Sequence, residues 1–162
     1  MKKLSAFTLI ELMITISIAA ILLTAAWSGF STSIKNNRVG TQAHEVFTAL
    51  NLARSEAIKR SANISVCSDN NTTAWQSGWF IMTDTDSDCT IDAGDIVLRE
   101  WDSFTGDITL TGSNSSITYS SDGRADSALT LTLVPPECSG VQARKISVSA
   151  TGRPSLAETS CP

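Results

Sequence analysis

The residues with the clearest ligand chemistry are five aspartates in one short segment: Asp84, Asp86, Asp88, Asp92 and Asp95. They fall on positions 1, 3, 5, 9 and 12 of a loop, which is the spacing of the oxygen ligands in an EF-hand calcium site. Two positions depart from that site, because Cys89 replaces the glycine of the sharp turn and Asp95 replaces a bidentate glutamate. The residues after Asp95 are also strand-like rather than helical. We therefore expect a solvated acidic loop tied by Cys89, in which Ca²⁺ would be a weak structural ligand.

A second set of residues, near the carboxyl end, could contact phosphate groups: Arg144, Lys145 and Arg153, with Arg124 as a further candidate. Two or three phosphate contacts give only weak, salt-sensitive binding to nucleic acid. The chain has a net charge of −4, which opposes a general nucleic-acid-binding surface. Surface or subunit-contact roles are therefore the favoured interpretation of these residues, and DNA binding is the alternative.

No arrangement of catalytic residues is evident in the sequence. The single histidine, His44, has no cysteine or second histidine near it. The sequence also contains neither a phosphate-binding glycine loop nor a dinucleotide-binding fingerprint. We expect a protein that is not an enzyme and needs no cofactor, with His44 facing solvent or a subunit interface.

The element that must position everything else is an apolar segment at the amino end. Residues 7–27 carry a single charged side chain, Glu11. At about 1.5 Å per residue, a helix of this length crosses a hydrocarbon core of roughly 30 Å. Lys2 and Lys3 precede the segment and predict that its amino end stays on the cytoplasmic side. A carboxylate inside such a segment costs about 2.5–3.5 kcal/mol, so Glu11 needs a partner or a function.

The residues around this point, Lys2-Lys3-Leu4-Ser5-Ala6 followed by Phe7-Thr8-Leu9-Ile10-Glu11-Leu12, resemble the class III leader of type IV pilins and type II secretion pseudopilins. The resemblance implies that prepilin peptidase cuts between Ala6 and Phe7 and that the new amino group of Phe7 is methylated. It also implies that Glu11 pairs with the Phe7 amino group of a neighbouring subunit during filament assembly, which makes Glu11 a device for setting register. Ala6 stands where the family usually has glycine, so we expect slower processing.

Four cysteines, Cys67, Cys89, Cys138 and Cys161, all lie beyond the membrane segment. An even number in an exported domain indicates two disulfides, for which three connectivities exist. We favour Cys67–Cys89 and Cys138–Cys161, because each pair closes a modest local loop. None of the spacings is CxxC, so we expect no zinc site.

The remaining sequence predicts an α+β fold, with a long amino-terminal helix packed on an antiparallel β-sheet head domain, and the resemblance implies that this is the type IV pilin fold. Apolar residues from Val39 to Ile58 recur at three- and four-residue steps, which predicts an amphipathic helix that continues to about Arg60. Beyond Ser61, short β-like runs alternate with turn residues, and they cover 64–67, 79–83, 96–101, 108–110, 117–120, 129–134 and 146–150. Leucine alternates with threonine in the run 129–134, a period of two that suits a sheet with one wet face. The expected organisation is a leader peptide (1–6), a transmembrane helix (7–27), its amphipathic continuation (28–61) and a periplasmic β-rich head (62–162).

Later motifs make the chain similar to the GspH/FimT branch of this superfamily: 38–60, 64–67, 78–80, 96–99, 120–124 and 148–153. The branch implies a minor pilin that joins or primes a type IV pilus, or else a minor pseudopilin of type II secretion. Some members bind DNA through a Gly-Arg-x-Arg motif, of which Gly152-Arg153 is present while Ser155 replaces the second arginine. The implied partners are other pilin or pseudopilin subunits, prepilin peptidase, the inner membrane and, in the DNA-binding alternative, DNA. The implied location is the inner membrane, with a single pass, and then the filament.

Overall fold

The computed structural model describes residues 8–162, without the side chains of residues 25–29 and 31. The predicted leader and the predicted cleavage site at Ala6 and Phe7 lie outside the described residues. The chain divides into two units, residues 1–36 and 37–162, which we call the amino-terminal unit and the head unit.

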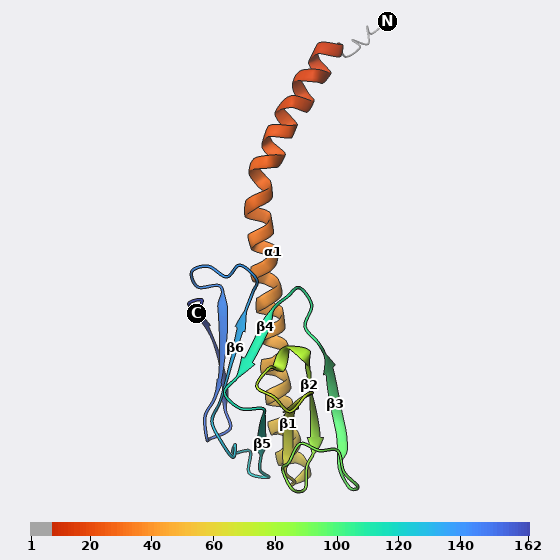
Figure 1. Cartoon of the computed structure of the whole chain (residues 1–162), viewed down its shortest axis with the longest axis vertical. Helices are drawn as coiled ribbons and strands as arrows, with labels where there is room; N and C mark the ends of the chain where they lie inside the picture. Colours follow the sequence, from red (N-terminus) through yellow and green to blue (C-terminus); the bar gives the residue numbers. More distant parts are fainter. Residues whose placement is uncertain (1–7) are drawn as a thin grey trace, which may run out of the picture. The chain divides into compact units, whose positions relative to one another are not determined.

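A single helix, α1 (Leu9–Arg60), supplies the amino-terminal unit and enters the head unit (Figure 1). Its first turn is capped by Thr8, whose Oγ1 accepts a hydrogen bond of 3.3 Å from the Glu11 backbone N–H. Its end lies at the predicted position, and Lys59 and Arg60 in the last turn complement the helix dipole. Among the residues that the structure describes, no helix meets the length and apolarity needed to cross a membrane.

In the head unit, α1 buries one stripe of mostly small side chains. Apart from the adjacent pair Ala49 and Leu50, its fully buried positions are three or four residues apart: Val39, Ala43, Val46, Ala49, Leu50, Ala53 and Ala57. Alanine at four of them lets the helix backbone approach the sheets closely. This confirms the predicted amphipathic helix, although Ile58, which the same pattern placed on the apolar stripe, is 51% exposed.

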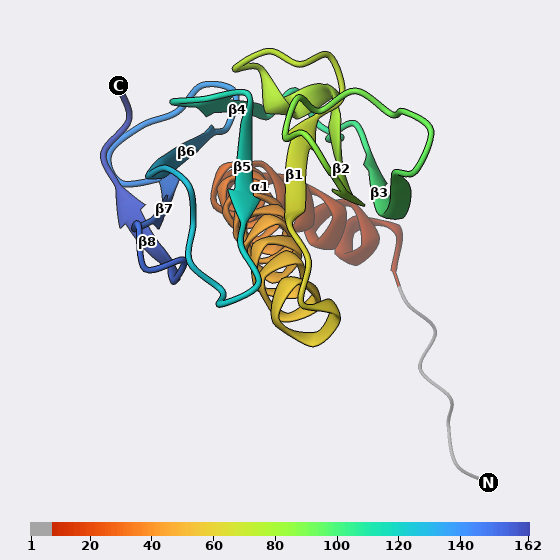
Figure 2. The same ribbon diagram turned by 90° about the horizontal axis from the view of Figure 1, so that it is seen from below.

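Eight antiparallel strands form two sheets of four in the head unit. The first sheet has the order β3-β2-β1-β5, with bounds Ile96–Asp102, Gly78–Thr83, Ile64–Ser68 and Ser116–Tyr119. The second has the order β4-β6-β7-β8, with bounds Thr109–Gly112, Leu129–Val134, Ala143–Val148 and Pro154–Thr159. A 3₁₀ turn, Trp75–Ser77, precedes β2. Figure 2 shows the strands of both sheets arranged around the part of α1 that belongs to the head unit.

Seven of these strands overlap predicted β-like runs, and β8 does not. Pro154 opens β8 opposite Val148, at the edge of the second sheet. An edge strand tolerates proline at its first position because no ladder hydrogen bond is lost there. Local propensity therefore gave no signal for this strand.

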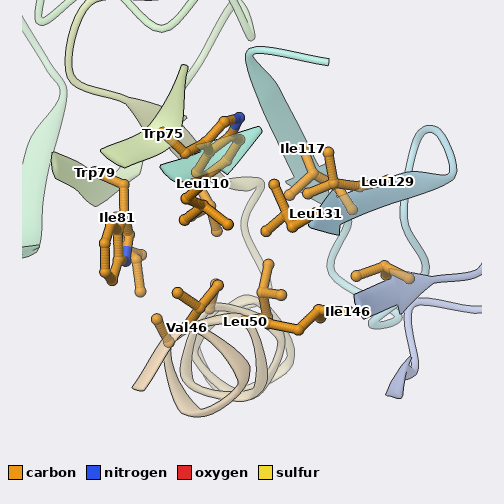
Figure 3. Close-up of a cluster of buried hydrophobic side chains, with 14 of the residues drawn as sticks. Val46, Leu50, Trp75, Trp79, Ile81, Leu110, Ile117, Leu129, Leu131 and Ile146 are labelled. Atoms are coloured by element: carbon orange, nitrogen blue, oxygen red, sulfur yellow. The ribbon is translucent and has the colours of Figure 1, made fainter. Parts of the chain in front are cut away.

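One hydrophobic core joins the helix to both sheets (Figure 3). Val46 and Leu50 of α1 face Leu110 and Leu131 of the second sheet and Ile81 of the first, and all five are 1% exposed or less. In β6 the leucines are buried and the threonines between them are half-buried, which confirms the predicted period of two. Because every layer contributes to this core, the head unit folds as one body around α1.

Candidate functional site

Two of the glycine-arginine motifs singled out in the sequence meet at one corner of the head unit. Residues 120–123 form a turn closed by a 2.8 Å bond from the Gly123 N–H to the Ser120 carbonyl, and residues 149–152 form a similar one, from Gly152 to Ser149, at 2.7 Å. Both glycines have a φ of +76°, a conformation that side chains with a Cβ rarely adopt. A Cβ at Gly152 would overlap the Gly123 carbonyl oxygen. The two turns are therefore in direct backbone contact.

Arg54 of α1 ties this corner to the helix. Its Nε donates a 2.8 Å hydrogen bond to the Gly123 carbonyl, and its terminal nitrogen donates one of 3.3 Å to the Thr151 carbonyl. One planar guanidinium thus satisfies an acceptor on each turn. Burial raises the pKa of the neighbouring Tyr119 phenol, partly opposed by the positive charge of Arg54. The role of Arg54 was not predicted, because a lone arginine on a helix carries no signal for such a contact.

At the other end of α1, Glu11 sits in the first helical turn and is exposed. Thr8 and Glu11 have the Thr-x-x-Glu spacing of a capping box, and the Thr8 half of that motif is formed. Ten large apolar side chains between residues 9 and 23 are more than half exposed: Leu9, Ile10, Leu12, Met13, Ile14, Ile16, Ile18, Ile21, Leu22 and Leu23. An exposed apolar surface of this kind is typical of a segment that packs against other apolar side chains or lipid.

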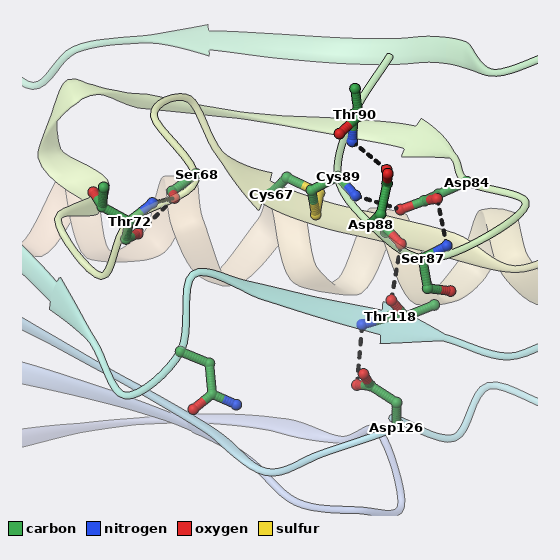
Figure 4. The surroundings of a disulfide bond; sticks show 12 residues. Cys67, Ser68, Thr72, Asp84, Ser87, Asp88, Cys89, Thr90, Thr118 and Asp126 are labelled. Carbon is green, nitrogen blue, oxygen red and sulfur yellow. Dashed lines mark hydrogen bonds between the residues drawn. A yellow bond between two sulfur atoms is a disulfide. The ribbon is translucent and has the colours of Figure 1, made fainter. Parts of the chain in front are cut away.

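The cysteines form the two predicted disulfides. Cys67 pairs with Cys89 and Cys138 pairs with Cys161, across 22 and 23 positions of sequence, and the described residues contain no free cysteine. Cys67 is buried in β1, and its bridge ties the acidic loop over Phe80 and Met82 on the first sheet (Figure 4). The second bridge links the segment before β7 to the chain end after β8.

The five aspartates of the candidate calcium loop do not converge. Oxygen atoms of Asp84, Asp86 and Asp88 lie within 4.8 Å of one another, whereas Asp92 and Asp95 belong to no such group among the described residues. The Asp84 carboxylate is buried and accepts hydrogen bonds from the backbone N–H groups of Ser87 and Cys89, at 2.7 and 3.2 Å (Figure 4). Asp88 and Asp95 also accept backbone N–H groups of the loop.

These contacts give the aspartates a structural use, which is to satisfy the backbone of the loop that Cys89 anchors. Partial loss of hydration, followed by the nearby negative charge of Asp88, raises the pKa of Asp86. The loop is therefore held by its own hydrogen bonds and its disulfide, in line with the expected solvated acidic loop.

The basic residues of the candidate DNA site point to different faces. Arg144 and Lys145 are neighbours in β7, and successive side chains of a strand alternate between its two faces. The Arg144 side chain is 14% exposed, forms a 3.0 Å ion pair with Glu158 and donates to three backbone carbonyls. Lys145 and Arg153 are exposed. The structure thus leaves Lys145 and Arg153 open to solvent, while Arg144 is committed to the edge of the second sheet.

The remaining candidate, His44, is exposed on α1, as expected.

The fold is similar to that of two solved proteins. Minor pilin FimU of the Pseudomonas aeruginosa type IV pilus matches with a TM-score of 0.64 and 24% identity, over 75% of this chain and 89% of FimU. A second crystal form of FimU matches with a TM-score of 0.59. The minor pseudopilin EpsH of the Vibrio cholerae type 2 secretion system matches with a TM-score of 0.50 and 16% identity, over 75% of this chain and 97% of EpsH.

Two family profiles also match, and together they cover most of the sequence. Residues 1–27 match the prokaryotic N-terminal methylation motif. Residues 42–152 match the type II transport protein GspH. A search of curated proteins by sequence finds no match. The chain therefore belongs to the GspH family of minor pilins and pseudopilins, within the type IV pilin superfamily.

Proposed function

We propose that this protein is a minor subunit of a type IV pilus, which joins or primes the filament through α1 after prepilin peptidase removes residues 1–6. The main support for this proposal is that one chain combines the methylation motif, over residues 1–27, with a match to GspH over residues 42–152. The higher TM-score of the pilus protein FimU, relative to the secretion protein EpsH, supports the pilus over the pseudopilus.

The described part of α1 supports a physical route to assembly. Cleavage before Phe7 would leave Thr8 as the second residue, so that the capped helix starts almost at the new amino group. The exposed apolar side chains between Leu9 and Leu23 would then pack against the helices of neighbouring subunits. The Glu11 carboxylate has no ion-pair partner among the described residues, and a neighbour's Phe7 amino group would supply one.

The proposed location follows from the same features. The subunit would first reside in the inner membrane, with a single pass, and would expose its head to the periplasm. The two disulfides fit this location, because disulfides persist in the oxidising periplasm.

The test compares Glu11→Gln with Glu56→Gln in the organism that carries the gene. Both changes remove one carboxylate from α1, but Glu56 pairs locally with Lys59 and Arg60 at the far end of the helix. We expect both variants to reach the membrane and to lose residues 1–6, as measured by mass spectrometry. Only Glu11→Gln should be missing from sheared filaments. Normal incorporation of Glu11→Gln would contradict the proposed register role.

A second candidate is a minor pseudopilin of type II secretion, which the description of the matching family favours. Deletion of the gene separates the two. Loss of surface pili with normal secretion would support the pilus, and loss of secretion with normal pili would support the pseudopilus.

A further inference from the structure

A cavity of about 280 Å³ opens in the head unit where α1 meets the end of β3. The helix contributes Gln42 and Glu45, and the strand with the loop behind it contributes Glu100, Trp101, Asp102, Ser103, Phe104 and Thr105. None of these residues belongs to the corner, the disulfides or the acidic loop described above.

The cavity is acidic and its charges are unpaired. Glu45, Glu100 and Asp102 line it, and none of them forms an ion pair within the part of the chain that the structure describes. Two cations lie nearby: the guanidinium of Arg99 lies over the Trp101 ring, 4.7 Å from its centroid, and Arg38 lies against Gly106. Neither arginine lines the cavity. The site therefore presents negative charge without a bound counter-charge of its own.

A buried acceptor in the wall of the cavity also lacks a donor. Gln42 is 8% exposed, and its Nε2 donates a 3.2 Å hydrogen bond to the Thr105 carbonyl. Its Oε1 is buried and has no hydrogen-bond partner among the described residues. A buried carbonyl oxygen of this kind costs stability unless a donor reaches it. This observation is independent of the carboxylates, and it also favours an occupant that donates hydrogen bonds.

Apolar surfaces complete the site. Trp101 and Phe104 line the cavity, and both pack on Trp79, at centroid distances of 5.7 and 5.2 Å. Trp101 is 9% exposed, with Trp79 stacked on it and the Arg99 guanidinium over its ring, so the half-buried Phe104 offers the surface for an aliphatic chain. These groups together fit an occupant that has an apolar stem and a cationic head with several hydrogen-bond donors. Arginine and lysine side chains have that form.

We propose that this cavity receives an arginine or lysine side chain of a neighbouring subunit, so that it sets the partner and register of the head in the filament. The inference rests on the proposed function, since it needs a neighbouring subunit. Carboxylates around a cationic head favour the correct partner and disfavour an acidic one. The aliphatic stem would pack on Phe104, while the head donates to Glu100 and Asp102. The Gln42 oxygen has less than 1 Å² of accessible surface, so it would accept from the head only after the side chain rotates toward the cavity.

The test uses the full chain in a non-ionic detergent and two small probes. N-acetyl-arginine amide carries the charged guanidinium, and N-acetyl-citrulline amide is a neutral compound of nearly the same shape. We expect the arginine probe, in a titration followed by amide and indole NMR shifts, to move the signals of Gln42, Trp101 and residues 102–105. The citrulline probe should leave them in place. Equal shifts with both probes, or no shifts at these residues with arginine, would overturn the proposal.

Two double variants with the same change in charge sharpen the result. Glu100→Gln/Asp102→Asn removes two carboxylates from the cavity, and Asp86→Asn/Asp88→Asn removes two from the acidic loop. We expect the first to weaken arginine binding about tenfold or more, because charge-assisted hydrogen bonds are lost, and the second to leave it unchanged. Equal weakening by both would show a non-specific charge effect and overturn the proposal. Binding of Ca²⁺ at these residues in place of the arginine probe would also overturn it.

A cellular measurement separates this inference from the proposed function. Glu100→Gln/Asp102→Asn should be processed normally and enter filaments less efficiently than Asp86→Asn/Asp88→Asn. Arginine binding combined with normal incorporation of Glu100→Gln/Asp102→Asn would refute the subunit contact. If arginine does not bind while Glu11→Gln still fails to assemble, the cavity proposal falls and the proposed function stands.

Discussion

The contact between the two glycine turns predicts a graded cost for alanine at three positions. At Gly152, the backbone has a φ of +76°, and a Cβ would overlap the Gly123 carbonyl oxygen and lie 3.1 Å from its carbon. An L-residue in this conformation costs about 1–2 kcal/mol, of which the less flexible unfolded chain returns roughly 0.4–1 kcal/mol. Overlap with fixed backbone atoms adds about 1–3 kcal/mol. We therefore expect Gly152→Ala to lower the free energy of unfolding by about 2–4 kcal/mol.

Gly140 is the matched control, because it also has a positive φ, 62°, but nothing lies within 4 Å of a Cβ there. Gly140→Ala should lower the free energy of unfolding by only about 1 kcal/mol, the conformational part alone. Gly123→Ala should fall between the two, because its Cβ would meet the movable side chain of Ile58 at 2.7 Å.

The assay is urea unfolding of the oxidised full chain in a mild detergent, followed by the fluorescence of the buried Trp75 and Trp79. The slope with denaturant should stay constant across the three variants, so that shifts of the midpoint report stability. A Gly152→Ala variant within about 0.5 kcal/mol of Gly140→Ala would refute the contact between the turns, since surface changes alone fall in that range.

Four further outcomes follow from the structure. Arg54→Met should lower the free energy of unfolding by about 1–3 kcal/mol in the same urea assay, because the Gly123 and Thr151 carbonyls lose their donor. Arg60→Met breaks only a surface ion pair and is the control, so an equal or smaller effect of Arg54→Met would contradict this. Removal of the Cys67–Cys89 bridge by a double alanine variant should lower the free energy of unfolding by about 2–4 kcal/mol. Hydrogen exchange should show lost protection centred on residues 84–95, and protection lost evenly over the head would argue against a local tether. The Ser120 hydroxyl and then the Arg124 N–H hold the pKa of Asp122 below its usual 3.8, so its stabilising effect is present above about pH 4 and is lost as pH falls through the lowered pKa. The stability gap between wild type and Asp122→Asn should therefore narrow as pH falls below about 4, and a constant gap would contradict this. DNA binding by the full chain at physiological salt should be absent, and micromolar binding that Lys145→Ala/Arg153→Ala abolishes would revive the DNA-uptake alternative.

The sequence alone determined the features that depend on local pattern. Spacing of three and four residues predicted where α1 buries its stripe and where it ends, because helical periodicity is a local property. The alternation of leucine and threonine predicted β6 in the same way. The disulfide pairing also followed from local loop closure, since both bridges join cysteines that are near in sequence.

The tertiary structure decided which distant segments meet. No local signal reports that β1 pairs with β5 while β4 joins a second sheet, that β8 extends that sheet from Pro154, or that two glycine turns share one arginine of α1. The charged side chains show the same division, because Arg144 and Lys145 are adjacent in sequence, yet the pleat of β7 turns them to opposite faces and pairs Arg144 with Glu158. The acidic cavity likewise forms only when Gln42 and Glu45 of α1 come to lie beside the end of β3, nearly sixty positions later. Local residue patterns specify each element, whereas the burial of one shared core specifies which elements, and therefore which charges, lie side by side.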